Sequence, residues 1–293
     1  MLIRCGYRIV FETEAPVPMI ALLHVRPERQ EDLRTEETLH TDPKIPTRQF
    51  VDRFGNVATR MVLPAGTTTL SADFIVADSG DHDDYAPEAE RHDIDSLPDD
   101  ALPYLMGSRY CEVGKLADEA WAAAGDKPTG WAMVQALVDL AHEQIEFGYS
   151  HARSDRTAFD AFGERHGVCR DFAHLAITLC REVNIPARYC TGYLGDLGIE
   201  PIDAPMDFSA WFEAFIGGKW YAFDARHNAP RIGRVVMARG RDATDTALTT
   251  GFGASELREF HVHCDEVAGM ELDKPPSETA VPQTYRPATF AKG

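Results

Sequence analysis

The stretch that most constrains the fold is residues 166–174, which read His-Gly-Val-Cys-Arg-Asp-Phe-Ala-His. From Cys169 onward, apolar residues recur at three- and four-residue spacing, at Phe172, Leu175, Ala176, Leu179 and Val183. This period is typical of an amphipathic helix packed on a core. Asn184 and Pro186 provide a stop signal. The pattern therefore predicts a buried helix whose first turn carries a thiol.

A thiol at that position is a candidate nucleophile. The first turn of a helix presents unpaired N–H groups and the positive end of the helix dipole, and both favour thiolate over thiol. The alternative is a small residue that only packs. Cys180 lies on the apolar face of the helix and Cys190 lies in a predicted strand, so structural roles are expected for both. The six cysteines are scattered without a C-x-x-C pair, which favours neither a disulfide framework nor a zinc ribbon.

The first 80 residues are predicted to form a β-rich domain. Short runs of β-branched and aromatic residues, separated by proline and turn residues, predict strands at 3–12, 19–25, 32–40, 47–52, 57–63 and 67–76. Strands at this spacing indicate an antiparallel sandwich or barrel. Residues 81–103 are acidic and poor in large apolar groups, so they are predicted as a linker, with a solvated loop inside one domain as the alternative. The remaining ranges are a cysteine domain over 104–270 and a loosely ordered tail over 271–293.

The predicted cysteine domain alternates helices with a strand and a hairpin. Helices are expected over 111–124, from Pro128 to about residue 147, and over 157–165, with a strand over 188–194. Gly217-Gly218 separates strand patterns at 206–215 and 219–226, which predicts a tight hairpin.

Counting from the Gly217-Gly218 turn gives the register of this hairpin. Trp211 then lies opposite Asp224, and Ser209 opposite Arg226. Opposed residues share a face of the sheet, so Ser209 and Asp224 are diagonal neighbours while His227 points to the other side.

The cysteine segment, Ala210-Trp211-Phe212-Glu213 and Phe223-Asp224-Ala225-Arg226 together resemble the transglutaminase-like superfamily of bacterial candidate cysteine proteases. The resemblance covers about residues 104–265, and residues 2–78 resemble the β-rich region that often precedes this domain. It implies an α+β, papain-like core in which a helix carrying cysteine packs on an antiparallel sheet. It also implies a Cys-His-Asp triad with Cys169 as nucleophile and Asp224 as the carboxylate that orients the base.

The chain departs from the family at the base. Ser209 stands where the family has histidine, and a hydroxyl does not accept a proton near neutral pH as imidazole does. Other candidate bases are His227, His174 and His166. Two hypotheses follow: a cysteine hydrolase or acyltransferase with an altered triad that acts on amide bonds through a Cys169 thioester, or a catalytically degenerate protein that binds a peptide or protein partner.

Two further residues are candidates for the cleft. Trp211 is expected in the core or in the cleft wall. Arg226 is expected either to pair with Asp224 or to bind a substrate carboxylate.

A metal site built from His261, His263, Cys264 and Asp265 is a weaker hypothesis, because no third ligand with fixed spacing is evident. The sequence therefore predicts neither a metal nor a cofactor.

The charge balance limits the partners. A formal net charge of −18 argues against nucleic acid or an anionic membrane surface. A peptide or protein substrate is expected, and the sequence does not indicate an oligomeric state. The beginning of the chain has no apolar stretch of signal-peptide length, so a cytoplasmic location is expected.

Overall fold

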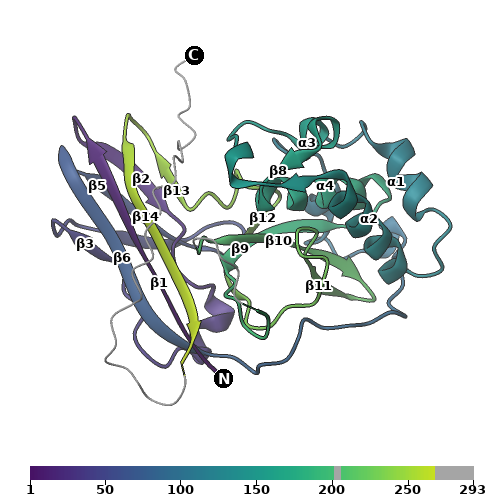
Figure 1. The fold of residues 1–293 in the computed structure, drawn as a ribbon, viewed down its shortest axis with the longest axis horizontal. Helices are drawn as coiled ribbons and strands as arrows, with labels where there is room; N and C mark the ends of the chain where they lie inside the picture. The colour runs from purple at the N-terminus through teal and green to yellow at the C-terminus, as the bar shows by residue number, and fades with distance from the viewer. Residues whose placement is uncertain (201–205, 268–293) are drawn as a thin grey trace.

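Two four-stranded antiparallel sheets form the sandwich on the left of Figure 1. The computed structural model describes residues 1–200 and 206–267. The strand orders are β14-β1-β6-β3 and β13-β2-β5-β4. Their bounds are β1 Leu2–Thr13, β2 Val17–Ala21, β3 His40–Asp42, β4 Arg48–Val51, β5 Val57–Leu63, β6 Gly66–Ala77, β13 Thr249–Gly251 and β14 Glu256–Glu266. Inward-facing residues of both sheets, including Tyr7, Ile9 and Met61, share one core.

Two sequence expectations for this part differ from the structure. The continuous strand expected over 32–40 is absent: after a 3-10 turn, η1 (Pro27–Asp32), Leu33 forms an isolated β-bridge with Val76, and a strand resumes only at His40–Asp42. Its many charged residues offer too few apolar groups for a buried strand. In addition, β13 and β14 lie within the range expected for the cysteine domain, yet they pair with β2 and β1. The chain returns to the sandwich because apolar residues of β14, such as Val262 and Cys264, complete its core.

A third four-stranded sheet, together with the helices, forms the other half of the molecule, on the right of Figure 1. Its order is β11-β10-β9-β12, with β9 Ala187–Tyr193, β10 Ser209–Ile216, β11 Lys219–Phe223 and β12 Val235–Gly240. The helices are α1 Ala117–Ala124, α2 Gly130–Gln144, α3 Ala158–Glu164 and α4 Cys169–Glu182. Two short strands, β7 (Glu146–Phe147) and β8 (His166–Gly167), form a parallel pair. The turn η4 (Tyr149–His151) follows β7 in the chain. The predicted α+β architecture, with a cysteine helix on an antiparallel sheet after a β-rich region, is confirmed.

Helix α4 is buried along almost its whole length. Every residue from 171 to 182 is buried, and Phe172, Leu175 and Ala176 share a core with Ala210 and Phe212 of β10. After the helix, Asn184 adopts a left-handed conformation with φ 60°, and Ile185 N–H bonds back to the carbonyl of Cys180. This is a Schellman-type end of the kind that a stop signal predicts.

The hairpin of β10 and β11 has the predicted register. Phe215 pairs with Trp220, and Glu213 pairs with Ala222. The ladder ends at the pair of Phe212 and Phe223, so the residues after Phe223 follow a turn rather than a strand.

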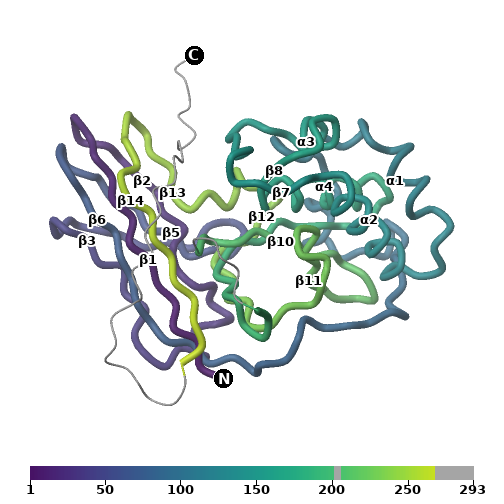
Figure 2. Tube along the Cα trace, viewed as in Figure 1, coloured from purple at the N-terminus to yellow at the C-terminus, as the bar shows by residue number. Residues whose placement is uncertain are grey.

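Residues 81–103, which we call the strap, make specific contacts rather than acting as a loose linker. Figure 2 shows the strap running from the sandwich along the lower edge of the molecule to the helices. It contains the turn η2 (Ile94–Ser96) and the start of η3 (Leu102–Leu105), and His82 forms a β-bridge with Ile232. Further on, the carbonyl of Ala89 accepts from Trp131 N–H. Most of its residues are exposed, and backbone pairing gives it a fixed path.

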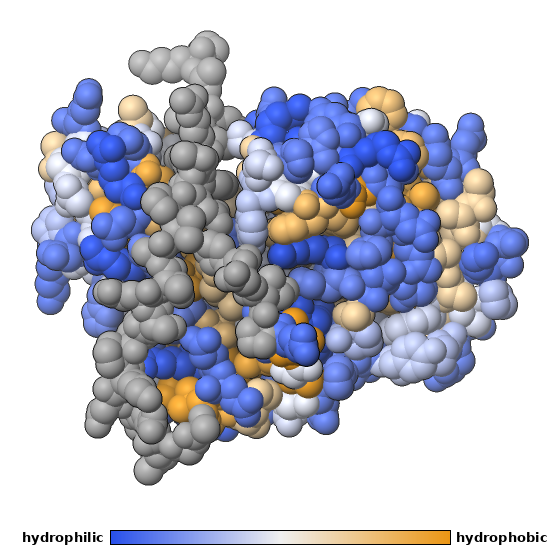
Figure 3. Space-filling view, viewed as in Figure 1, coloured by the Kyte–Doolittle hydropathy of each residue, from blue (hydrophilic) through white to orange (hydrophobic). Residues whose placement is uncertain are grey.

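The surface is largely polar. Hydrophilic residues cover most of the helical half in the view of Figure 3. Within residues 1–200 and 206–267, no helix combines the length and the apolar character that crossing a bilayer requires.

The start of α4 depends on a close approach at Gly167. Asp171 Oδ2 accepts from Val168 N–H at 2.9 Å and from Arg156 Nη1 at 3.0 Å, so one buried carboxylate ties the helix start to the preceding loop. A Cβ at position 167 would lie 2.8 Å from Asp171 Cβ and Oδ2. Only glycine fits there without moving this carboxylate.

We therefore expect Gly167→Ala to lower the free energy of unfolding by about 1–3 kcal/mol, the usual cost of overpacking. Gly163→Ala in α3 is the matched control, because nothing lies within 4 Å of a Cβ there, and it should stabilise by up to about 1 kcal/mol through helix propensity. Urea unfolding of both variants measures the difference. Equal effects would contradict the assigned role of Gly167.

Candidate active site

Cys169 is the most accessible cysteine of the described chain. It is half-buried at the first position of α4, whereas the other five cysteines are buried. The sulfur lies against the backbone N–H of Ala210, with the guanidinium of Arg226 and the carboxyl of Asp207 as charged neighbours. Helix α4 and strand β10 thus bring residues 169 and 210 together.

The protonation state of this thiol differs from the sequence expectation. Burial raises the pKa of Cys169 to about 11, the positive charge of Arg226 and the Ala210 N–H act to lower it, and the Asp207 carboxyl acts to raise it. Burial therefore opposes the preference for thiolate that was predicted at the helix start, because loss of solvation outweighs the favourable neighbours. A neutral thiol needs a base before it can attack a carbonyl.

Asp224 follows β11 directly and binds an imidazole. Its Oδ2 lies 2.9 Å from His227 Nδ1 and 3.2 Å from Arg234 Nη2, while Oδ1 accepts from the backbone N–H groups of Arg226 and His227. Burial alone would raise the pKa of Asp224, but the hydrogen bond from His227 and the charge of Arg234 hold it well below its usual range. Because a carboxylate only accepts, the shared proton sits on His227 Nδ1, which leaves Nε2 as the acceptor of the ring.

The position of His227 corrects the register argument. Continued pairing would have pointed its side chain away from Asp224, but the ladder ends at Phe223 and a turn brings the ring back to its own carboxylate. The ion pair that was expected between Arg226 and Asp224 is formed by another arginine. Arg234 makes that ion pair, and the Arg226 guanidinium lies 3.8 Å from the centre of the Phe147 ring.

Ser209 is the first residue of β10 and is buried. It directly precedes Ala210, whose backbone N–H lies near the Cys169 sulfur. Its carbonyl accepts from Thr191 Oγ1 at 3.1 Å. The hydroxyl offers no base, and the imidazole near Asp224 comes from a different element.

The other predicted residues make contacts of their own. Trp211 is only 2% exposed and packs beneath the Arg234 guanidinium, so it is a core residue rather than a cleft wall. His166 lies near Glu164, with its ring 4.4 Å from that of His151. His174 is buried, and burial lowers its pKa to about 3.

Sequence reasoning missed Asp207, Tyr149 and Arg234. Burial raises the pKa of Asp207 to about 6, against the charge of Arg226. The Tyr149 hydroxyl hydrogen-bonds Arg226. Tyr149 and Arg226 both lie near the ionisable groups of Cys169 and Asp207. The nearness of Asp207 to Ser209 in the chain was the available signal. Arg234 lies outside the motifs from which the site was predicted.

Residues 261–265 make other contacts than those of a metal centre. His263 Nε2 lies 3.2 Å from Asp73 Oδ1, and Cys264 Sγ lies 3.8 Å from Cys5 Sγ. Over the described ranges, no three His, Cys, Asp or Glu side chains are grouped to hold a metal ion.

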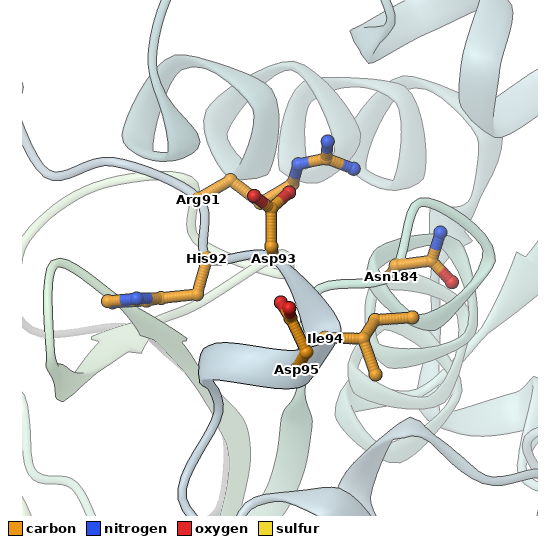
Figure 4. A pocket seen from close by; sticks show the side chains of 6 residues that line it. All are labelled: Arg91, His92, Asp93, Ile94, Asp95 and Asn184. Atoms are coloured by element: carbon orange, nitrogen blue, oxygen red, sulfur yellow. The ribbon is translucent and has the colours of Figure 1, made fainter.

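The pocket in Figure 4 is not part of this site. It has a volume of about 380 Å³ and is lined by residues 91–95 of the strap and by Asn184. Asn184 follows the end of α4, which has 14 residues, whereas Cys169 begins it. At a rise of ~1.5 Å per residue, about 20 Å separates the two ends.

The chain is similar to several known proteins. The profile of the Transglutaminase-like superfamily matches residues 116–225. A crystal structure of a candidate cysteine protease from Cytophaga hutchinsonii shares 33% identity and a TM-score of 0.78, covering 94% of this chain and 93% of that one. An uncharacterised protein of Mycobacterium leprae (strain TN) is 32% identical over 131 residues, which is 42% of this chain and 47% of that protein. The chain thus spans about half the length of that relative.

The raised pKa of Cys169 predicts slow alkylation of the native protein. The alkylation rate of a free thiol levels off above a pH of about 8.5, its ordinary pKa. The rate of Cys169 with iodoacetamide should instead keep rising beyond that pH, by about tenfold per pH unit. Arg226→Met should slow the reaction further, because the positive charge of Arg226 favours thiolate. Arg8→Met is the control, since Arg8 pairs with Glu259 on the sandwich. Mass spectrometry of the modified peptides gives the rates, and a plateau at or below pH 8.5 would contradict the assignment.

Proposed function

Because the chain belongs to the transglutaminase-like superfamily, we propose that it is a cysteine-dependent hydrolase or acyltransferase that acts on amide bonds through a Cys169 thioester. Cys169 would be the nucleophile and His227, oriented by Asp224, the base that Ser209 is unable to supply. The observation that carries this proposal is the hydrogen bond of 2.9 Å between Asp224 and His227.

The need for a base follows from the state of the thiol. With the pKa of Cys169 raised to about 11, only a small fraction is thiolate at neutral pH, so attack and proton removal have to be coupled. His227 presents Nε2 as acceptor, and Asp224 would stabilise the imidazolium that forms. Arg226, the residue before His227, is already a neighbour of the sulfur, which supports the approach of this turn to Cys169.

In the proposed reaction, Cys169 Sγ bonds to the carbonyl carbon of an amide while its proton moves to His227 Nε2. The N–H groups at the start of α4 stabilise the negative oxygen. The C–N bond then breaks, and the leaving amine takes the proton from His227. Water or a second amine attacks the thioester, which regenerates the thiol.

The alternative is a degenerate member that binds a peptide or protein partner without turnover. Ser209 favours it directly, since the residue at the family's base position is inert. The neutral thiol is compatible with it as well.

A cytoplasmic location and a peptide or protein substrate complete the proposal. All six cysteines are free, which supports a reducing compartment. The relative from Cytophaga hutchinsonii is described as a candidate cysteine protease, which supports a peptide substrate.

For the enzyme, we expect Cys169→Ala to abolish hydrolysis of p-nitrophenyl acetate and of a casein peptide mixture. His227→Gln should lower kcat about 100- to 10,000-fold, because it removes the proton acceptor. His166→Gln is the matched control, since its ring contacts Glu164 and His151, and it should retain activity within about twofold. Loss of activity in His166→Gln but not in His227→Gln would reverse the assignment of the base.

Ser209→His distinguishes the enzyme from the degenerate protein. If the parent is an enzyme that uses His227, a second imidazole should change kcat by less than about tenfold, because a working base is already present. Hydrolysis that appears only in Ser209→His, with none in the parent, would establish the degenerate reading. Ser209→Asn is the control for a larger polar side chain without a base.

A further inference from the structure

The polar contacts of Asp224 continue through Arg234 to the strap. Arg234 Nη2 bonds Asp224 Oδ2 at 3.2 Å, while its Nε lies 2.8 Å and 3.1 Å from the two oxygens of Asp83. A single guanidinium therefore joins two carboxylates. Asp83 comes from the segment whose composition predicted a linker, 151 residues before Arg234 in the chain.

Asp83 is itself held in place by backbone pairing. Its N–H donates to the carbonyl of Arg231 at 2.9 Å, and its Oδ2 accepts from Arg231 N–H at 2.9 Å. The neighbouring bridge between His82 and Ile232 extends this pairing. The carboxylate therefore has one defined orientation toward Arg234.

The guanidinium between them is buried. The Arg234 side chain is 8% exposed, that of Asp83 13% and that of Asp224 2%. Its guanidinium carbon lies 5.0 Å from the centre of the Trp211 ring. A buried cation is stable only when it is paired. Without Asp83, Asp224 would be the only carboxylate left to pair with Arg234 and to fix its orientation. Arg234 would then compete with His227 for Asp224 Oδ2.

We propose that Asp83 is a positioning residue of the candidate active site. By fixing Arg234, it holds the Asp224 carboxylate, and through it the His227 imidazole, in the orientation that acyl transfer needs. The expected loss of activity rests on the proposed function, whereas the expected loss of imidazole orientation does not.

The test compares Asp83→Asn and Asp83→Glu with the neighbouring control Asp84→Asn. Asp84 is exposed and pairs with Lys219 on the surface, so its variant removes the same charge from the strap without touching Arg234. Steady-state kinetics with p-nitrophenyl acetate give kcat and KM. The ¹⁵N shifts of the His227 ring, assigned by their loss in His227→Gln, report which nitrogen carries the proton.

We expect Asp83→Asn to lower kcat by up to about 100-fold, as misplacement of a catalytic group by about 1 Å does, with KM within about twofold. The His227 shifts should move from those of an Nδ1–H ring toward a mixture of tautomers. Asp83→Glu should recover part of both signals, and Asp84→Asn should match the parent. If Asp83→Asn does not fold, Arg234→Lys replaces it in the test and should show the same changes. A lysine ammonium lacks the planar, forked set of N–H donors with which a guanidinium joins two carboxylates.

Asp83→Asn with the ¹⁵N shifts of the parent would overturn the proposal, whatever its activity. If the parent lacks Cys169-dependent turnover, the proposed function fails, but the ring shifts still decide whether Asp83 orients His227. Changed shifts without turnover would thus support positioning and reject catalysis.

Discussion

The burial of α4 against β10 is the constraint on which the site depends. It fixes the sulfur of Cys169 against the N–H of Ala210, and it removes much of the solvent around the thiol. The same packing therefore positions the candidate nucleophile and disfavours its ionisation. A helix dipole is worth about 1 kcal/mol at its end, and desolvation of a buried charge costs more. Under the proposed function, this balance makes a base necessary, which is why a serine at position 209 is informative.

Much of the fold could be predicted because its signals are local. The three- and four-residue spacing after Cys169 and the Gly217-Gly218 turn depend only on neighbouring residues, and the predicted helix and the hairpin register match the structure. The parts that failed depend on contacts between distant segments. Pairing of β14 with β1 and the fixed path of the strap have no signature in composition.

The site shows the same division. Cys169 and Asp224 were found from motifs, and their catalytic roles remain proposals. His227 was placed on the wrong side because counting assumed that the strand continued past Phe223. The sequence of residues 224–227 does not indicate that the strand ladder ends at Phe223. Burial shifted the pKa of Cys169 in the opposite direction to the helix-dipole argument, and Asp207 was missed because its burial is a tertiary property.

The pairing of β1 with β14 has a consequence for how the chain folds. Ile3 of β1 pairs with Glu266 of β14, so the sheet that contains β1 is complete only when β14 has been synthesised. The helices and the cysteine sheet are, in chain order, an insertion within the sandwich. During synthesis, the helical part can collapse while β1 still has an open edge. Contacts of such sequence separation close slowly, and an unpaired strand edge is prone to association.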